Sequence, residues 1–419
     1  MELAKALRIQ LERQVSHWDS ASLALTRPED FASQAAWQAL ERYLDVAIRS
    51  SLDKSTKRLR SEVGGLRVQL NNSHSVAELR TVQRRLEHVR HLYQKVETVV
   101  GFFSEAVNTR TSSRLATLLS ATDFIAVQSM RTVLQPLGVT VPPVLTYVDK
   151  GLGASILRAG VRLWDGEISP AASIKVTRHN ILRPTSVTHE TGHQVAHLLG
   201  WNAEIVPLIL SALRSEPGLG ELWASWASES TADAFAFACC GYAAVAALHD
   251  VVANDTHSVL RILPGDPHPV AYLRVLLGTE MCKRFGSGPW DDLAAAWTVV
   301  YSTRDLPAAT REVMERSRQY LPQLVGILLD RPLQCFGGRP LTRLVDPGRV
   351  TPAALEAMAR DAGPSLFTSA HWASREALRI VALTGLRIAT DPSQTTKHSD
   401  DYVRFTQTIR SLAPAQTAA

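Results

Sequence analysis

The segment at residues 185–200 contains the side chains best suited to chemistry, because His189, Glu190 and His193 form the pattern His-Glu-x-x-His. Residues four apart on a helix lie on one face, one turn above the other. Two imidazoles at that separation can bind one metal ion, with each ring nitrogen at about 2.0–2.1 Å. Glu190 can reach a water molecule on the open side of the metal and act as a general base. The pattern therefore predicts a catalytic zinc site on a helix.

A catalytic zinc ion needs a third protein ligand besides an open position. His197 shares the face of His189 and His193, but eight residues of helix span about 12 Å, which is too far for one tetrahedral centre. Glu229 is the better candidate, because it lies in an Ala-rich helical segment with Asp233 one turn further on. Asp233 can accept the free ring N–H of a ligand histidine and fix its tautomer.

These assignments have structural alternatives. The two histidines could be unrelated residues on a surface helix, although the apolar residues of the same segment indicate a helix packed inside a domain. Glu229 and Asp233 could be an acidic pair that is favoured by the positive end of a helix dipole. Glu204 and Glu221 are weaker candidate ligands, because neither has a partner one turn along a clear helix.

A further histidine, His268, stands between Pro267 and Pro269 at the predicted start of a helix. Proline suits the first helical turn. A histidine fixed at such a junction can donate a hydrogen bond to an oxyanion, whereas a lone loop histidine is more commonly just exposed. The position of His268 after the two predicted zinc-binding helices favours the catalytic interpretation.

In this order the residues resemble the gluzincin metallopeptidases, and among them the HtpX-like and CAAX-prenyl-type peptidases. The shared pattern is HExxH at residues 189–193, ExxAD at residues 229–233, and HPxxxxR from His268 to Arg274. The resemblance implies a zincin-like core, a transition-state role for His268 and a bracing role for Arg274. Those relatives are largely membrane-embedded, whereas this sequence has no predicted span, so their substrate type is not carried over.

The composition restricts the class of protein. Of the 419 residues, 45% are hydrophobic and 20% are charged with both signs mixed, so a sizeable core is expected and disorder is not. A net charge of +5 without a run of five basic residues gives no reason to expect nucleic-acid binding. Four cysteines without CxxC spacing suit a reducing compartment. With neither a signal-peptide pattern nor a long apolar run, we expect a cytoplasmic protein.

Residues 1–138 are predicted to form a helical hairpin or bundle. After a turn at residues 71–73, apolar residues recur in steps of three and four, which is typical of a helix with a packing seam. The seam consists of Leu79, Val82, Leu86, Val89, Tyr93, Val96, Val100 and Phe103. We favour an intramolecular bundle over a dimerising coiled coil. These helices remain candidates for association with a partner or a second copy, and a third helix is expected at about residues 112–135.

Residues 139–300 are the predicted metallopeptidase core, and residues 301–419 a helical C-terminal region. Three short strands, near residues 139–151, 160–166 and 173–177, precede the HExxH helix and are expected to form a small antiparallel sheet. The strand at residues 173–177 could bind an extended peptide along its edge. The expected fold class is mainly α (α+β), with a helical N-terminal domain, a zincin-like core and a helical C-terminal region.

The sequence therefore predicts a metalloendopeptidase with Zn²⁺ as cofactor and a protein or peptide as substrate. Two alternatives stay open. One is a zinc hydrolase of a non-peptide amide or ester, and the other is a helical scaffold or regulatory protein with a non-catalytic zinc site. The intact Glu190 argues against the scaffold, because a structural site does not need a general base.

Overall fold

The computed structural model of the protein describes residues 2–161 and 169–412. These residues are 75% helical, with 19 α-helices and one small three-stranded sheet, so the mainly α class is confirmed. By its contacts the chain divides into two compact units, residues 1–116 with 157–173 and residues 117–156 with 174–419. The predicted division of the chain into three domains, with boundaries at residues 138 and 300, stays a prediction.

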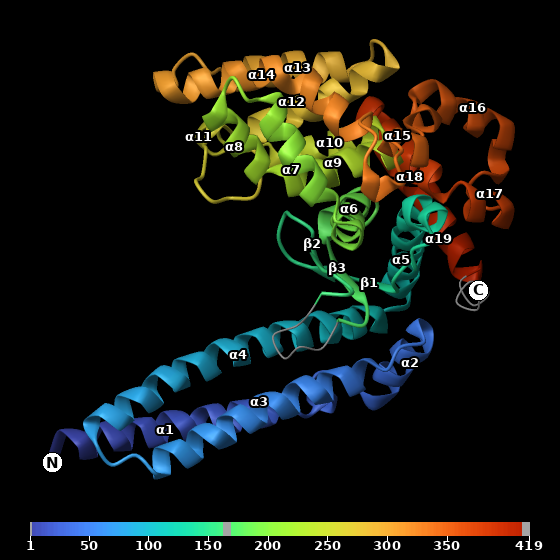
Figure 1. Ribbon diagram of the computed structural model, residues 1–419. Helices are drawn as coiled ribbons and strands as arrows, with labels where there is room; N and C mark the ends of the chain where they lie inside the picture. Colours follow the sequence, from blue (N-terminus) through green and yellow to red (C-terminus); the bar gives the residue numbers. More distant parts are fainter. Residues whose placement is uncertain (1, 162–168, 413–419) are drawn as a thin grey trace. The chain divides into compact units, whose positions relative to one another are not determined.

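The first unit contains long helices that pack side by side (Figure 1). Its helices are α1 (Glu2–Ala24), α2 (Gln34–Leu44), α3 (Ile48–Asn71) and α4 (Val76–Asn108). Ser75 begins α4 with a capping box, in which its Oγ accepts from Glu78 N at 3.2 Å and Glu78 Oε2 accepts from Ser75 N at 2.9 Å. The predicted hairpin is therefore present as α3 and α4, with its helix cap at Ser75.

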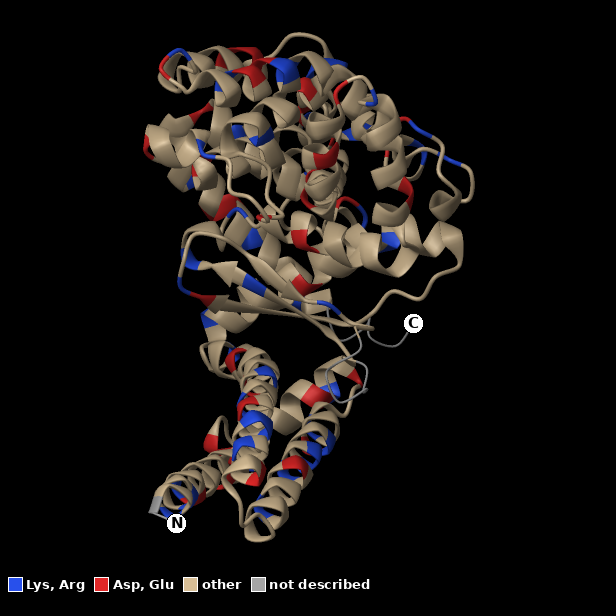
Figure 2. Cartoon of the chain, turned by 60° about the vertical axis from the view of Figure 1, so that its left-hand side comes forward, with Lys and Arg blue, Asp and Glu red and all other residues tan. Residues whose placement is uncertain are grey.

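The apolar seam of α4 is buried within this unit, against α1 and α3. Every predicted seam residue is buried except Tyr93, and Leu92 is buried in its place. The Tyr93 hydroxyl lies 3.0 Å from the carboxylate of Glu97. Val89 and Val96 on either side are buried as predicted, so the difference is confined to this one position. The seam is covered by neighbouring helices, and charges of both signs line these helices (Figure 2). Association with another chain would therefore need other surfaces. Such association stays a prediction.

The remaining elements lie wholly or largely in the second unit. The strands are β1 (Val144–Asp149), β2 (Ser155–Leu157) and β3 (Ala172–Thr177). The helices up to the second ligand segment are α5 (Ser113–Leu134), α6 (Ser186–Leu199), α7 (Trp201–Ala212), α8 (Pro217–Ser225) and α9 (Ala227–Cys240). The later helices are α10 (Tyr242–Val252), α11 (Thr256–Leu260), α12 (Ala271–Cys282), α13 (Pro289–Val300), α14 (Ala308–Leu329), α15 (Leu341–Leu344), α16 (Pro352–Ala362), α17 (Ala370–Arg375), α18 (Ala377–Thr390) and α19 (Thr395–Leu412).

The sheet differs from the predicted one in three respects. Its order is β1-β3-β2, and its strand directions are mixed rather than antiparallel. Because β3 is the central strand, both of its sides are paired, so the hypothesis that residues 173–177 bind a peptide along a free edge is wrong. The predicted strand at residues 160–166 lies mostly outside the described residues, and β2 ends before it.

Buried hydrogen bonds connect the sheet to α5 and α5 to α6. Thr146 of β1 donates from its backbone N and its Oγ1 to Asp123 Oδ1, at 2.6 and 2.8 Å. Ser129 Oγ of α5 lies 2.7 Å from Thr191 Oγ1 of α6. These contacts fix α6, the helix of the His-Glu-x-x-His pattern, against the elements that precede it in sequence.

Helix α6 ends at Gly200, as predicted. Gly200 has a φ of 69°, a left-handed conformation that favours glycine. Helix α7 follows at once and is bent by 93° relative to α6. Among the described residues, no single helix is long and apolar enough to cross a membrane, and α6 and α7 satisfy the length and composition criteria only as this bent pair.

Candidate metal centre

Helices α6 and α9 approach closely because of a glycine. A Cβ atom on Gly192 would lie 2.9 Å from Ala232 Cα and 3.1 Å from Ala232 O. Real Cβ atoms essentially never approach another atom as closely as 2.9 Å, so only glycine fits at position 192 without a shift. The small residues at this crossing bring the Glu229 side chain of α9 next to the histidines of α6.

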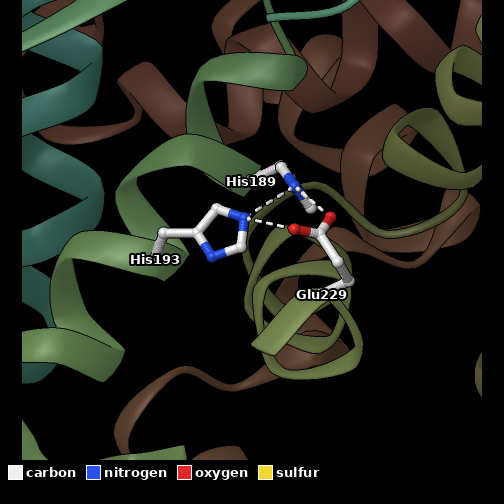
Figure 3. Close-up of side chains that lie close together, drawn as sticks. All are labelled: His189, His193 and Glu229. Carbon is white, nitrogen blue, oxygen red and sulfur yellow. Dashed lines mark hydrogen bonds and ion pairs between the residues drawn. The ribbon is translucent and has the colours of Figure 1, made fainter. Parts of the chain in front are cut away.

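Three side chains from these helices converge (Figure 3). His189 Nε2 lies 3.2 Å from His193 Nε2 and 3.3 Å from Glu229 Oε2. His193 Nε2 lies 3.2 Å from Glu229 Oε1. One potential ligand atom from each residue lies within 4.8 Å of the other two, so the group could hold a metal ion.

The outer nitrogens of both histidines are engaged elsewhere, which fits a cation between the inner ones. His189 Nδ1 lies 2.8 Å from Asp233 Oδ1, and His193 Nδ1 lies 3.3 Å from Ser228 Oγ, whose oxygen can accept a hydrogen bond from it. When the Nδ1 atoms carry the protons, both Nε2 lone pairs face each other and the Glu229 carboxylate. Three acceptors in one place repel one another unless a cation lies among them.

Arg274 of α12 holds the two carboxylates of α9. It donates from Nε to Asp233 Oδ2 at 2.6 Å and from Nη2 to Asp233 Oδ1 at 2.8 Å. Nη2 also lies 3.2 Å from Glu229 Oε2. Only 9% of the Arg274 side chain is exposed, so the guanidinium faces these carboxylates and not solvent. These contacts are compatible with the bracing role that the resemblance implies for Arg274, and its part in the reaction stays a prediction.

The electrostatics of the cluster favour positive charge at its centre. Burial opposes ionisation of Glu229, but hydrogen bonds from His189 and His193 and the charge of Arg274 hold its pKa well below the ordinary value. Burial also opposes ionisation of Asp233, and Arg274 lowers the pKa of that carboxyl to about 2. For His189, burial lowers the pKa, but Asp233 and Glu229 outweigh it and raise the pKa to about 10. The carboxylates thus favour a cation at His189, either a proton or a metal ion.

Glu190 and His268 lie around this cluster. Glu190 is 5% exposed, and burial raises the pKa of its carboxyl, although the charges of His189 and His193 oppose this. His268 Nε2 lies 3.7 Å from Glu229 Oε2, and 55% of the His268 side chain is exposed. His268 therefore faces the solvent side of the cluster, whereas Glu190 is enclosed.

The weaker candidate ligands lie elsewhere. Glu204 accepts from the backbone N of Gln334 at 2.8 Å and of Cys335 at 2.6 Å, so its carboxylate stabilises a loop. Glu221 and His197 are exposed and are not in the cluster. Among the described residues, His189, His193 and Glu229 are the group whose ligand atoms meet.

Comparison of the chain with protein-family models, with curated proteins and with solved structures found no match. The resemblance to gluzincin peptidases therefore depends on the residues at 189–274 alone.

Sequence reasoning missed three residues that shape this centre: Gly192, Ser228 and Asp266. Gly192 stands inside the His-Glu-x-x-His pattern, where a residue without a side chain permits close approach of another backbone. Ser228 directly precedes a predicted ligand, and Asp266 precedes His268 by two residues, a spacing at which aspartate often accepts from the backbone. The last two signals are common in loops and helix starts, so they could not single out these residues.

Replacing Gly192 by alanine is expected to weaken metal binding by about tenfold or more and to destabilise the protein by about 1–3 kcal/mol. The added methyl group would press on the Ala232 backbone and separate α6, with His189 and His193, from α9, with Glu229. Metal affinity measured against a competing chelator, together with thermal unfolding, checks this. Gly218→Ala is the matched control, because a Cβ there meets nothing within 4 Å; equal behaviour of both variants would contradict the prediction.

Proposed function

We propose that this chain is a zinc-dependent metallopeptidase of the gluzincin type. The observation that carries the proposal is the convergence of His189 Nε2, His193 Nε2 and the Glu229 carboxylate within 4.8 Å. Two imidazoles and one carboxylate are a ligand set typical of catalytic zinc, whereas structural zinc sites use four protein ligands and commonly cysteine. The buried Glu190 next to a ligand histidine supports a catalytic site further, since a structural site does not need it.

Each residue of the site has a task in such a reaction. A bound zinc ion would supply Lewis acidity, which polarises a peptide carbonyl and lowers the pKa of a water molecule to about 7. The Glu190 carboxylate accepts a proton from the attacking water and passes it to the leaving amine nitrogen. The raised pKa of Glu190 suits both transfers, because the carboxyl holds the proton more readily than an exposed one.

The residues around the ligands keep this arrangement in place. His268, on the exposed side of Glu229, can stabilise the negative charge that develops on the carbonyl oxygen. Asp233 holds His189 through Nδ1, and Arg274 holds Asp233 and Glu229. This division of tasks suits an amide substrate, because the leaving amine needs a proton, and we propose that the amide belongs to a protein or peptide.

Metal removal tests the proposal directly. We expect the purified full chain to contain about one zinc ion, to cleave members of a proteome-derived peptide library, to lose cleavage after chelation and to regain it with added zinc. Mass spectrometry of metal content and of cleavage products provides the measurement. Zinc-dependent cleavage of small amides but of no peptide would favour the non-peptide hydrolase instead. A zinc-bound chain without activity on either would favour the scaffold.

A further inference from the structure

The three histidines around Glu229 are held in the same manner. In each, Nε2 faces the Glu229 carboxylate, at 3.3 Å for His189, 3.2 Å for His193 and 3.7 Å for His268. In each, Nδ1 faces an oxygen atom of another side chain. These partners are Asp233 for His189 at 2.8 Å, Ser228 for His193 at 3.3 Å and Asp266 for His268 at 2.7 Å. Asp266 therefore has the same relation to His268 that Asp233 has to a ligand histidine.

Asp266 contacts His268 twice with one oxygen atom. Asp266 Oδ1 accepts from the backbone N of His268 at 2.9 Å and lies 2.7 Å from its Nδ1. Pro267 and Pro269, on either side of His268, restrict the backbone at this point. The hydrogen bonds from His268 also keep the pKa of Asp266 below its ordinary value, so the carboxylate is the form that accepts them. The backbone N and the ring Nδ1 of His268 therefore both contact the same carboxylate oxygen of Asp266.

This contact is needed because packing does not hold the ring. More than half of the His268 side chain is exposed, whereas 16% of His189 and 13% of His193 are. An exposed imidazole has three χ1 rotamers and about two orientations about χ2. Without Asp266, the orientation that directs Nε2 to Glu229 would be one of roughly six.

We infer that Asp266 is a positioning residue of the active site, which binds Nδ1 of His268 and thereby directs Nε2 toward the side of Glu229 where the substrate carbonyl reacts. The catalytic part of this inference rests on the proposed peptidase function. The orientation of the His268 ring does not depend on the proposed function, and it can be measured on the zinc-loaded protein without any substrate.

Nuclear magnetic resonance of the histidine rings tests the orientation. In the full zinc-loaded chain with ¹⁵N-labelled histidine, the signals of His268 are those that disappear in His268→Gln. In the neutral ring, at about pH 8.5, we expect Nδ1 of His268 to carry the proton in the wild type. Asp266→Ala is expected to shift the ring to the Nε2–H tautomer of a free imidazole, and Asp266→Asn, whose carbonyl oxygen can still accept, is expected to retain the Nδ1–H form.

Peptide cleavage tests the consequence for catalysis. Asp266→Ala is expected to lower kcat by up to about sixfold, because the productive orientation becomes one among roughly six, with KM changed less than twofold and zinc retained. Asp266→Asn is expected to recover most of kcat. Loss of a residue that only supported the loop would be expected to raise KM, because it would disturb substrate affinity, and it would leave the tautomer of the His268 ring unchanged.

Asp255→Ala is the matched control. Asp255 begins α11, on the same connection between α10 and α12, and its Oδ1 accepts from Ser258 N at 2.9 Å. The inference is overturned if Asp266→Ala leaves Nδ1 of His268 protonated, if Asp255→Ala alters the His268 ring as much, or if Asp266→Ala retains full kcat. A zinc-loaded wild type that cleaves no peptide refutes the proposed function instead, and the ring measurement then still decides the role of Asp266.

Discussion

Replacing Glu190 by glutamine is expected to lower kcat by about 10²–10⁴-fold while the zinc content stays at the wild-type level. The amide has the size of the carboxyl group but cannot accept the proton of the attacking water. Glu190 does not belong to the group of converging ligand atoms, so the metal site should survive the change. Metal analysis and cleavage of the best library peptide, on the same preparations, provide the measurement.

Two further variants make this result specific. Glu229→Gln removes the charge of a proposed ligand and should lose zinc together with activity. Glu221→Gln makes the same chemical change at an exposed position of α8 and should affect neither. Retention of a tenth or more of the wild-type kcat in zinc-loaded Glu190→Gln would contradict the role of Glu190 as general base.

Replacing Arg274 by alanine is expected to destabilise the second unit by about 3–5 kcal/mol, because it removes the cation from two buried carboxylates. In the metal-free protein, Asp233 and Glu229 both depend on this guanidinium. In the zinc-loaded protein, the metal would compensate Glu229 and leave only Asp233 unpaired. The loss should therefore be larger after chelation than before it.

Thermal unfolding with and without chelator measures both effects. The midpoint shifts by about 2–4 °C per kcal/mol in chains of 150–250 residues and by less in longer ones, so the midpoint of Arg274→Ala should fall by roughly 5 °C or more. Arg274→Lys should recover part of the loss, because one ammonium cannot make the same paired contact with Asp233. Arg284→Ala, which removes a partly exposed ion pair with Asp330, should cost at most about 1 kcal/mol. Equal midpoints for the Arg274 and Arg284 variants would refute the prediction.

Local spacing was sufficient to predict much of this protein. The four-residue separation of His189 and His193 predicted a shared helix face, and the structure places their Nε2 atoms 3.2 Å apart. The same rule predicted that Glu229 and Asp233 lie one turn apart on a second helix. The predicted hairpin of α3 and α4 also followed from local periodicity. Such features depend on helix geometry within a few residues, which sequence spacing specifies by itself.

The interpretation of the small sheet shows where this reasoning ends. The segment at residues 173–177 was identified correctly as a strand, but its pairing on both sides depends on β1 and β2. Strand order is set by long-range packing, and a run of β-branched residues has the same local pattern in a central strand as at an edge. In α4, likewise, neighbouring helices decided that Leu92 and not Tyr93 is buried.

The sequence by itself determined which residues can bind a metal ion and on which helices they lie, because residue type and helical period are local properties. Only the tertiary structure decided that Glu229 meets the two histidines, since this requires α6 and α9 to cross at Gly192. It also decided that Arg274 pairs with Asp233 and that Asp266 holds His268. Contacts between different elements depend on how their surfaces fit together, and residue spacing along the chain does not encode that fit.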